Sequence, residues 1–140
     1  MPPKQLVGSA VTRETVCVGQ AKVIESDSSI GRYRAVFEDD GATGYFYALD
    51  TTRPDNPIID ALHVYDAERI AERGQTCQLV ILWSADGLKT VLFVNSQAHA
   101  IYNFEAQRGC CRTGFPPAPI LGGGGSHAWD DAEMEHFHAQ

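Results

Sequence analysis

The 140-residue chain lacks the patterns that most often identify a function. It contains no run of about 18 consecutive apolar residues, so the sequence predicts no membrane-spanning helix. Its N-terminal stretch has no apolar segment of the kind found in secretory signals, which favours a cytoplasmic location. A Gly-x-Ser-x-Gly elbow, a phosphate-binding loop and a dinucleotide-binding fingerprint are also missing. The sequence therefore predicts no catalytic residue and no cofactor.

Cysteines are few, and their spacing excludes the usual metal and redox motifs. The four are Cys17, Cys77, Cys110 and Cys111, and no pair is separated by two residues. A zinc site would need ligands grouped at short spacings, and the adjacent pair could form a disulfide only through a strained ring. Cys17 and Cys77 lie in apolar runs, where reduced thiols are expected to be buried. This pattern fits a reducing cytosol and predicts no metal site.

Positive charge is scarce, since 11 Lys and Arg face 18 Asp and Glu, and the net charge is -7. The segment Glu38–Asp66 holds seven acidic residues against Arg53 alone, and four more acids follow Arg112 with no Lys or Arg. Such a distribution repels nucleic-acid phosphates and attracts a basic protein. The simpler explanation is a solvated acidic surface that keeps the protein soluble.

The segment VFEDDGATGYFYALD predicts a hairpin with strands over residues 32–38 and 44–49. Both Asp40-Gly41 and Thr43-Gly44 can form its turn, because Asp and Gly tolerate the required backbone angles. If Asp40-Gly41 is a two-residue loop, the glycine at position 44 lies opposite Phe37, whose ring would cover its bare backbone.

A second hairpin is predicted where QLVILWS and LKTVLFVN flank Asp86-Gly87. A two-residue loop there pairs Trp83 with Thr90 and Leu82 with Val91. Both faces of this hairpin are apolar, whereas a solvated face would alternate with polar residues. We therefore expect the hairpin to be central and covered on both sides.

Further strands are expected over residues 15–27, 58–65 and 98–104, and a two-turn helix over 66–73. Successive short strands between turn signals predict a mainly β, antiparallel domain with one short helix. Its hairpins would form a sandwich or a partly open barrel. We expect this single globular domain to span residues 1–119.

Residues 120–140 are expected to form a Gly-rich linker and an acidic C-terminal tail. The last part, from Trp129 to His138, is either disordered or a short amphipathic helix. In the second case it would dock onto the body through Trp129, Met134 and Phe137.

The candidate partner-binding residues are the carboxylates and tyrosines of the first hairpin: Glu38, Asp39, Asp40, Tyr45 and Tyr47. Tyrosine and an acidic rim suit an electrostatically steered protein interface. An acid–base site would need one buried carboxyl group, and a calcium loop would need alternating acids, which this turn lacks.

The histidines offer a second set of candidates. His63, close in sequence to Asp60 and Asp66, could be an oriented base, although a hydrogen-bonded structural histidine is the simpler interpretation. His136 and His138 with Glu133 could bind a metal ion only adventitiously.

The arginines of RGCCRTGFPP either bind an anion or have an internal structural role. We favour the second alternative, in which Arg108 and Arg112 pair with the acidic segment 38–66.

The strings FEDDGATGYFYALD, ALHVYD, LWSADGLK and RGCCRTGFPP resemble a family of short, uncharacterised bacterial cytosolic proteins. The resemblance covers roughly residues 16–117 and leaves the tail outside. It implies a common fold and assigns no reaction, cofactor or functional residue. By size and charge alone, the chain is also similar to immunity proteins of toxin systems.

These observations favour a non-catalytic protein-binding module, such as an immunity-type inhibitor of a basic protein. The alternative is a small-ligand-binding or enzymatic β-barrel-like domain, with a pocket lined by Trp83, Tyr102 or Phe46. A third hypothesis is a homo-oligomeric structural unit. The sequence predicts a monomer or homodimer that binds neither nucleic acid nor membrane.

Overall fold

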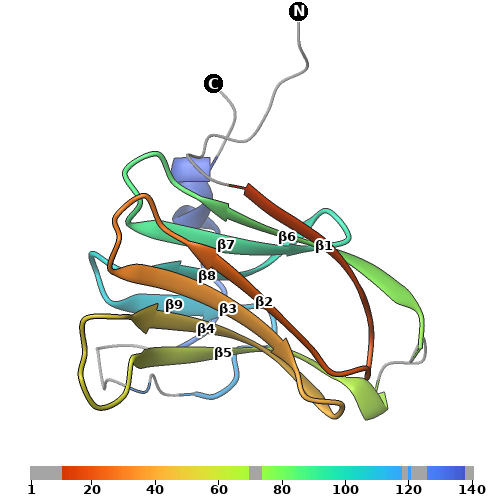
Figure 1. The fold of residues 1–140 in the computed structure, drawn as a ribbon. Helices are drawn as coiled ribbons and strands as arrows, with labels where there is room; N and C mark the ends of the chain where they lie inside the picture. Colours follow the sequence, from red (N-terminus) through yellow and green to blue (C-terminus); the bar gives the residue numbers. More distant parts are fainter. Residues whose placement is uncertain (1–10, 70–73, 118–119, 121–125, 138–140) are drawn as a thin grey trace, which may run out of the picture.

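The computed structural model describes residues 11–69, 74–117, 120 and 126–137. Its strands form two antiparallel sheets that pack face to face as a sandwich (Figure 1). One sheet has the order β1-β6-β7-β8-β9, and its strands are β1 (Val11–Cys17), β6 (Thr76–Trp83), β7 (Lys89–Val94), β8 (Gln97–Asn103) and β9 (Arg108–Cys111). The other has the order β2-β3-β4-β5, and its strands are β2 (Lys22–Asp27), β3 (Tyr33–Asp39), β4 (Thr43–Asp50) and β5 (Ile58–Asp66).

The predicted β-rich antiparallel fold is confirmed, and of its two arrangements the sandwich is the one observed. The described helical structure consists of two 3₁₀ segments, η1 (Ala67–Arg69) and η2 (Asp131–Phe137). The helix expected over 66–73 is thus a single short turn at η1 as far as the chain is described, since residues 70–73 lie outside the described part.

The single strand expected over 15–27 is wrong, because this segment forms β1 and β2 in different sheets. Gly19 adopts a φ of 88°, in the left-handed region that favours glycine, and Gln20 N–H donates to the Cys17 carbonyl (3.0 Å). This turn carries the chain from one layer of the sandwich to the other.

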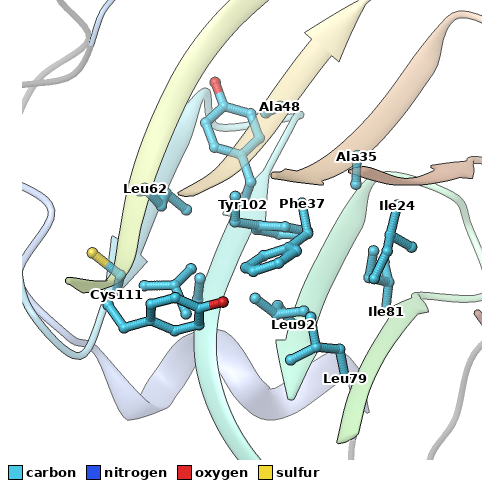
Figure 2. Close-up of a cluster of buried hydrophobic side chains, with 14 of the residues drawn as sticks. Ile24, Ala35, Phe37, Ala48, Leu62, Leu79, Ile81, Leu92, Tyr102 and Cys111 are labelled. Carbon is cyan, nitrogen blue, oxygen red and sulfur yellow. The ribbon is translucent and has the colours of Figure 1, made fainter. Parts of the chain in front are cut away.

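The β6–β7 hairpin has the predicted register, with Trp83 opposite Thr90 and Leu82 opposite Val91. Its two-residue loop is wrong, because Ser84 N–H donates to the Lys89 carbonyl (2.8 Å) and Gly87 N–H to the Ser84 carbonyl (2.9 Å), which closes a longer turn. Both of its faces are covered. The inner face, including Ile81, belongs to the core between the sheets, where Figure 2 shows side chains of both layers converging. Inside this core the Trp83 indole N–H donates to Ser26 Oγ (2.9 Å), which satisfies its polar atom.

The β3–β4 hairpin turns over residues 40–43, so the two-residue loop at Asp40-Gly41 is wrong. Asp40 N–H donates to the Thr43 carbonyl (3.1 Å), and Gly44 pairs with Asp39 instead of Phe37. The bare glycine backbone is covered from the next strand, because a Cβ on Gly44 would lie 2.9 Å from the Tyr65 ring. Tyr65, not Phe37, therefore provides the aromatic cover.

Strand β9 was not expected, and it places the adjacent cysteines on opposite faces of the sheet. Cys111 contributes to the core between the sheets, whereas Cys110 contributes to the outer apolar cluster. Both thiols are free, and burial raises the pKa of Cys110 to about 11. These cysteines are packing residues.

The C-terminal segment covers the outer face of the five-stranded sheet, where η2 lies beside the strands in Figure 1. Phe137 is completely buried, and Trp129 and Met134 pack against the same cluster as Leu82 and Val91. Of the two alternatives for the tail, docking is the one observed. The division into a body of residues 1–119 and a tail of 120–140 stays a prediction about which part folds alone.

Candidate binding face

The exposed side of the four-stranded sheet gathers most of the predicted site residues. Along β3 and β4 buried and half-buried residues alternate, because successive side chains point to opposite faces of a strand. Glu38, Tyr45 and Tyr47 point outward, and register pairs Tyr45 with Glu38 on one side and with His63 on the other. We call this surface the aromatic face; its rings are Tyr47, Tyr45, His63 and Phe115.

The four rings form a continuous row across β4, β5 and the loop after β9. Tyr45 and Tyr47 stack with centroids 5.9 Å apart, and His63 meets Tyr45 edge to face at 5.3 Å. Phe115 meets His63 at 5.8 Å, also nearly perpendicular, and is 51% exposed. Such contacts hold the rings in one arrangement, in which Phe115 stays exposed and His63 is buried.

Phe115 is held because its loop adds to the free edge of β5. His63 N–H donates to the Phe115 carbonyl (2.9 Å), and the Thr113 hydroxyl donates to the His63 carbonyl (3.1 Å). Phe115 N–H donates in turn to Thr113 Oγ1 (3.3 Å). This loop therefore extends the aromatic face beyond the last strand of the sheet.

Both ring nitrogens of His63 are engaged. Nε2 lies 2.8 Å from Asp66 Oδ1, and Nδ1 lies 3.0 Å from Thr113 Oγ1. Of the two predicted carboxylate neighbours, the structure brings Asp66 to His63 and places Asp60 elsewhere. His63 is 8% exposed, so its ring lies largely beneath the face while its nitrogens hold β5 and the Phe115 loop together, as the structural interpretation predicts.

Beside these rings lies an open pocket of about 650 Å³. It is lined by Thr43, Tyr45, His63, Tyr65, Asp66, Thr113 and Phe115. Burial raises the pKa of Tyr45, and the negative charges of Asp66 and Asp40 add to the effect. Burial likewise raises the pKa of Tyr47, with further contributions from Glu38 and Asp40. The tyrosine hydroxyl groups therefore lie in a negative potential, which a cation would find favourable.

Two adjacent predicted residues, Asp39 and Asp40, have different environments. Asp39 is 1% exposed and accepts hydrogen bonds from Gly19 N–H (2.8 Å), Gly41 N–H (2.8 Å) and the Tyr65 hydroxyl (2.6 Å). It fixes the turn from inside, and the structure does not bring it to the aromatic face.

Asp40 is exposed, and its Oδ1 accepts from the backbone N–H groups of Ala42 and Thr43 (both 2.9 Å). These bonds lower the pKa of Asp40, so its negative charge persists at the tip of the hairpin.

The arginines flanking β9 contact the C-terminal segment and not the acidic segment 38–66, so that part of the prediction is wrong. Arg108 Nη2 lies 3.8 Å from Asp130 and 3.9 Å from Glu133. The Arg112 guanidinium lies 3.8 Å from the Trp129 ring centroid. Their role is internal, as expected, but their partners are in the tail.

The pocket expected around Trp83, Tyr102 or Phe46 is also wrong. These side chains are 0%, 1% and 1% exposed and fill the space between the sheets. Among the described residues no three His, Cys, Asp or Glu side chains are grouped to hold a metal ion. His138 and the side chain of His136, named for adventitious metal binding, lie outside that description. No helix in the described ranges is long and apolar enough to cross a membrane.

Sequence reasoning missed His63 and Phe115 as parts of the binding face. The register between β4 and β5 brings His63 beside Tyr45. The sequence of either strand alone does not determine that register. Phe115 had one signal, since a large aromatic beside two prolines cannot continue a buried strand.

Two packed antiparallel sheets with a solvated aromatic face define a small β-sandwich protein. The chain belongs to the family described as uncharacterized protein conserved in bacteria (DUF2251), whose profile matches residues 16–138. The family thus includes the tail segment, and the expected end of the resemblance near residue 117 is wrong. An uncharacterized protein of Haemophilus influenzae (strain ATCC 51907 / DSM 11121 / KW20 / Rd) is 34% identical over 105 residues. That match covers 74% of this chain and 65% of the relative, so the chain spans just under two thirds of that protein. No solved structure matches the chain.

Proposed function

We propose that this protein is a non-catalytic binding module that holds a basic protein on its aromatic face. The observation that carries the proposal is the row of four rings, ending in the 51% exposed Phe115, beside the carboxylates of Glu38 and Asp40. Aromatic residues dominate the binding energy of many interfaces, and acidic rims increase the rate at which basic partners associate. An immunity-type inhibitor of a basic toxin is one form of this function, suggested by size and charge.

The charges on this face support a basic partner in preference to an acidic one. Arg34 is paired with Asp27 at 2.6 Å, so its positive charge is neutralised locally. Glu25 points outward from β2 opposite Val36, and Glu38 and Asp40 add two further negative charges. The face is therefore negative overall, which steers a cationic surface toward it.

The hydrogen bonding of His63 favours binding over catalysis. A general base needs a nitrogen within reach of the proton that it removes. Both nitrogens of His63 already contact protein groups, one on Asp66 and one on Thr113. The histidine is suited to fixing the geometry of the face, and the rings supply the contact area.

The proposal is tested by affinity capture from native lysate, followed by elution in a salt gradient. The Glu38→Lys/Asp40→Asn double variant is compared with wild type and with Glu105→Lys/Asp55→Asn. The second pair makes the same charge change at exposed positions away from the aromatic face. We expect a basic protein that elutes from the first variant at distinctly lower salt and from the control at the wild-type position. Identical elution from all three proteins would contradict the proposal.

A further inference from the structure

We infer that the pocket between Tyr45 and Phe115 receives an arginine side chain of the basic partner. This inference rests on the proposed function and names the group that the site would recognise. Its basis is the juxtaposition of aromatic walls, an open volume of about 650 Å³ and the carboxylate of Asp66 in the lining.

The walls of the pocket suit a planar cation. The ring plane of His63 is tilted by 75° from that of Tyr45 and by 85° from that of Phe115. Rings of different orientations therefore border the same space. The guanidinium group is flat, weakly hydrated and stacks on aromatic faces, whereas an ammonium group is compact and strongly hydrated. The same chain uses this contact internally, since Arg112 lies over the ring of Trp129 at 3.8 Å.

The charges around the pocket also favour a cation. Asp66, whose carboxylate lines the pocket, lies 2.8 Å from His63 Nε2. Burial raises the pKa of Tyr47, and the negative charges of Glu38 and Asp40 add to the effect, so the neighbourhood of the pocket is negative. The hydroxyl of Thr43 lines the same pocket and can accept a hydrogen bond from a guanidinium N–H group.

The pocket is large enough for a side chain and too open for tight binding of a free small molecule. Small-ligand sites usually enclose most of the ligand surface. Here Phe115 is half exposed and one side of the pocket opens to solvent. An arginine delivered by a folded partner would fill this space as an anchor, with the remaining interface excluding water around it.

The test is an NMR titration of the full chain with the peptides acetyl-Gly-Arg-Gly-amide, acetyl-Gly-Lys-Gly-amide and acetyl-Gly-citrulline-Gly-amide. We expect the arginine peptide to shift the ring signals of Tyr45 and Phe115 at millimolar concentration. Citrulline has nearly the same shape without the charge, so its peptide should produce no saturable shift. Equal binding of the citrulline or lysine peptide would overturn the inference.

Two variants locate the binding. Phe115→Ala removes a wall that is 51% exposed, and Val23→Ala removes a similar apolar group that is 53% exposed on the edge strand of the same sheet. The first should weaken binding of the arginine peptide at least about threefold, as expected for loss of a cation–π contact, and the second should leave it unchanged. Equal effects of both variants would overturn the assignment to this pocket.

Different results would contradict the arginine inference and the proposed binding function. If the arginine peptide leaves the Tyr45 and Phe115 signals unchanged while the charge variants still lower the elution salt of a captured basic protein, the inference is wrong and the binding function stands. If the peptide binds as expected but capture is insensitive to charge at Glu38 and Asp40, the proposed function is wrong.

Discussion

His127 and Asp60, which are 67 positions apart in the sequence, form an ion pair in which each side chain is 1% exposed. Nε2 lies 2.9 Å from Asp60 Oδ2, and Nδ1 lies 2.5 Å from the Pro116 carbonyl oxygen. A carbonyl oxygen only accepts hydrogen bonds, so Nδ1 must carry a proton, and Nε2 facing a carboxylate carries one as well. His127 is therefore an imidazolium that fastens the C-terminal segment to β5.

This pair makes the stability depend on pH. Burial lowers the pKa of His127, but the hydrogen bond and charge of Asp60 outweigh burial, so the pKa is raised above 6.5. The pKa of His127 is higher in the folded state than in the unfolded state. The stabilisation of the folded protein by the His127–Asp60 pair is therefore complete below about pH 6.5 and is lost as the pH rises through the folded pKa.

We expect His127→Gln to lower the free energy of unfolding by about 3 kcal/mol at pH 6, since it leaves Asp60 without its charged partner. The difference between wild type and variant should shrink as the pH is raised to 9. Urea denaturation at a series of pH values measures it. A difference that is constant with pH would show that His127 is uncharged in the folded protein.

Lys89 and Glu133 form a second attachment of the tail. Lys89 is 4% exposed, and its ammonium donates to Glu133 Oε1 (3.0 Å) and to the Glu133 carbonyl (2.9 Å). We expect Lys89→Met and Glu133→Gln each to destabilise the protein, and the double variant to lose less than the sum by about 1–3 kcal/mol. Chemical denaturation of the wild type, the two single variants and the double variant measures this coupling energy. Additive losses would mean that the two side chains contribute independently.

Phe137 and Phe115 allow a comparison of the same substitution in two environments. Phe137 is fully buried in the outer cluster, whereas Phe115 is 51% exposed. Phe137→Ala should cost about 3 kcal/mol or more, because it leaves a cavity against Leu82 and Val91. Phe115→Ala should cost no more than about 0.5 kcal/mol. Thermal unfolding of both variants measures this contrast, and similar losses would contradict the assignment of Phe115 to a binding surface.

Gly44 is required by the close approach of Tyr65. A Cβ at this position would lie 2.9 Å from the ring, so Gly44→Ala should destabilise the hairpin by about 1–3 kcal/mol. Gly31→Ala is the control, since nothing lies within 4 Å of a Cβ there. That variant should be neutral or more stable by up to about 1 kcal/mol. Wild-type stability of Gly44→Ala would show that Tyr65 can move aside at little cost.

The two hairpins show how far local sequence determines register. The β6–β7 hairpin keeps its predicted register although its turn spans residues 84–89, because matched apolar residues on both strands leave one favourable pairing. In the first hairpin the Asp40 carboxylate accepts from Ala42 N–H and Thr43 N–H, which places the turn at residues 40–43 and not at Asp40-Gly41. Pairing partners shift by two residues, so each side chain keeps its predicted face. Tyr45 and Tyr47 therefore point outward in either register.

The alternation of side chains also separates Asp39 from its neighbours. Phe37 is buried, so Asp39, two residues later on the same strand, must point inward as well. That conclusion was available from the strand period alone. Contacts such as His127 with Asp60, and His63 with Phe115, join segments whose relative placement no local pattern specifies.

The central claim, that the aromatic face binds a basic partner, is tested most directly by amide hydrogen exchange on the captured complex. Residues 40–45 and 113–115, which border the row of rings, should exchange more slowly with the partner bound than without it. The 84–89 turn lies away from this face and should exchange at the same rate in both states. Protection at that turn or along η2, with none at the Phe115 loop, would contradict the account.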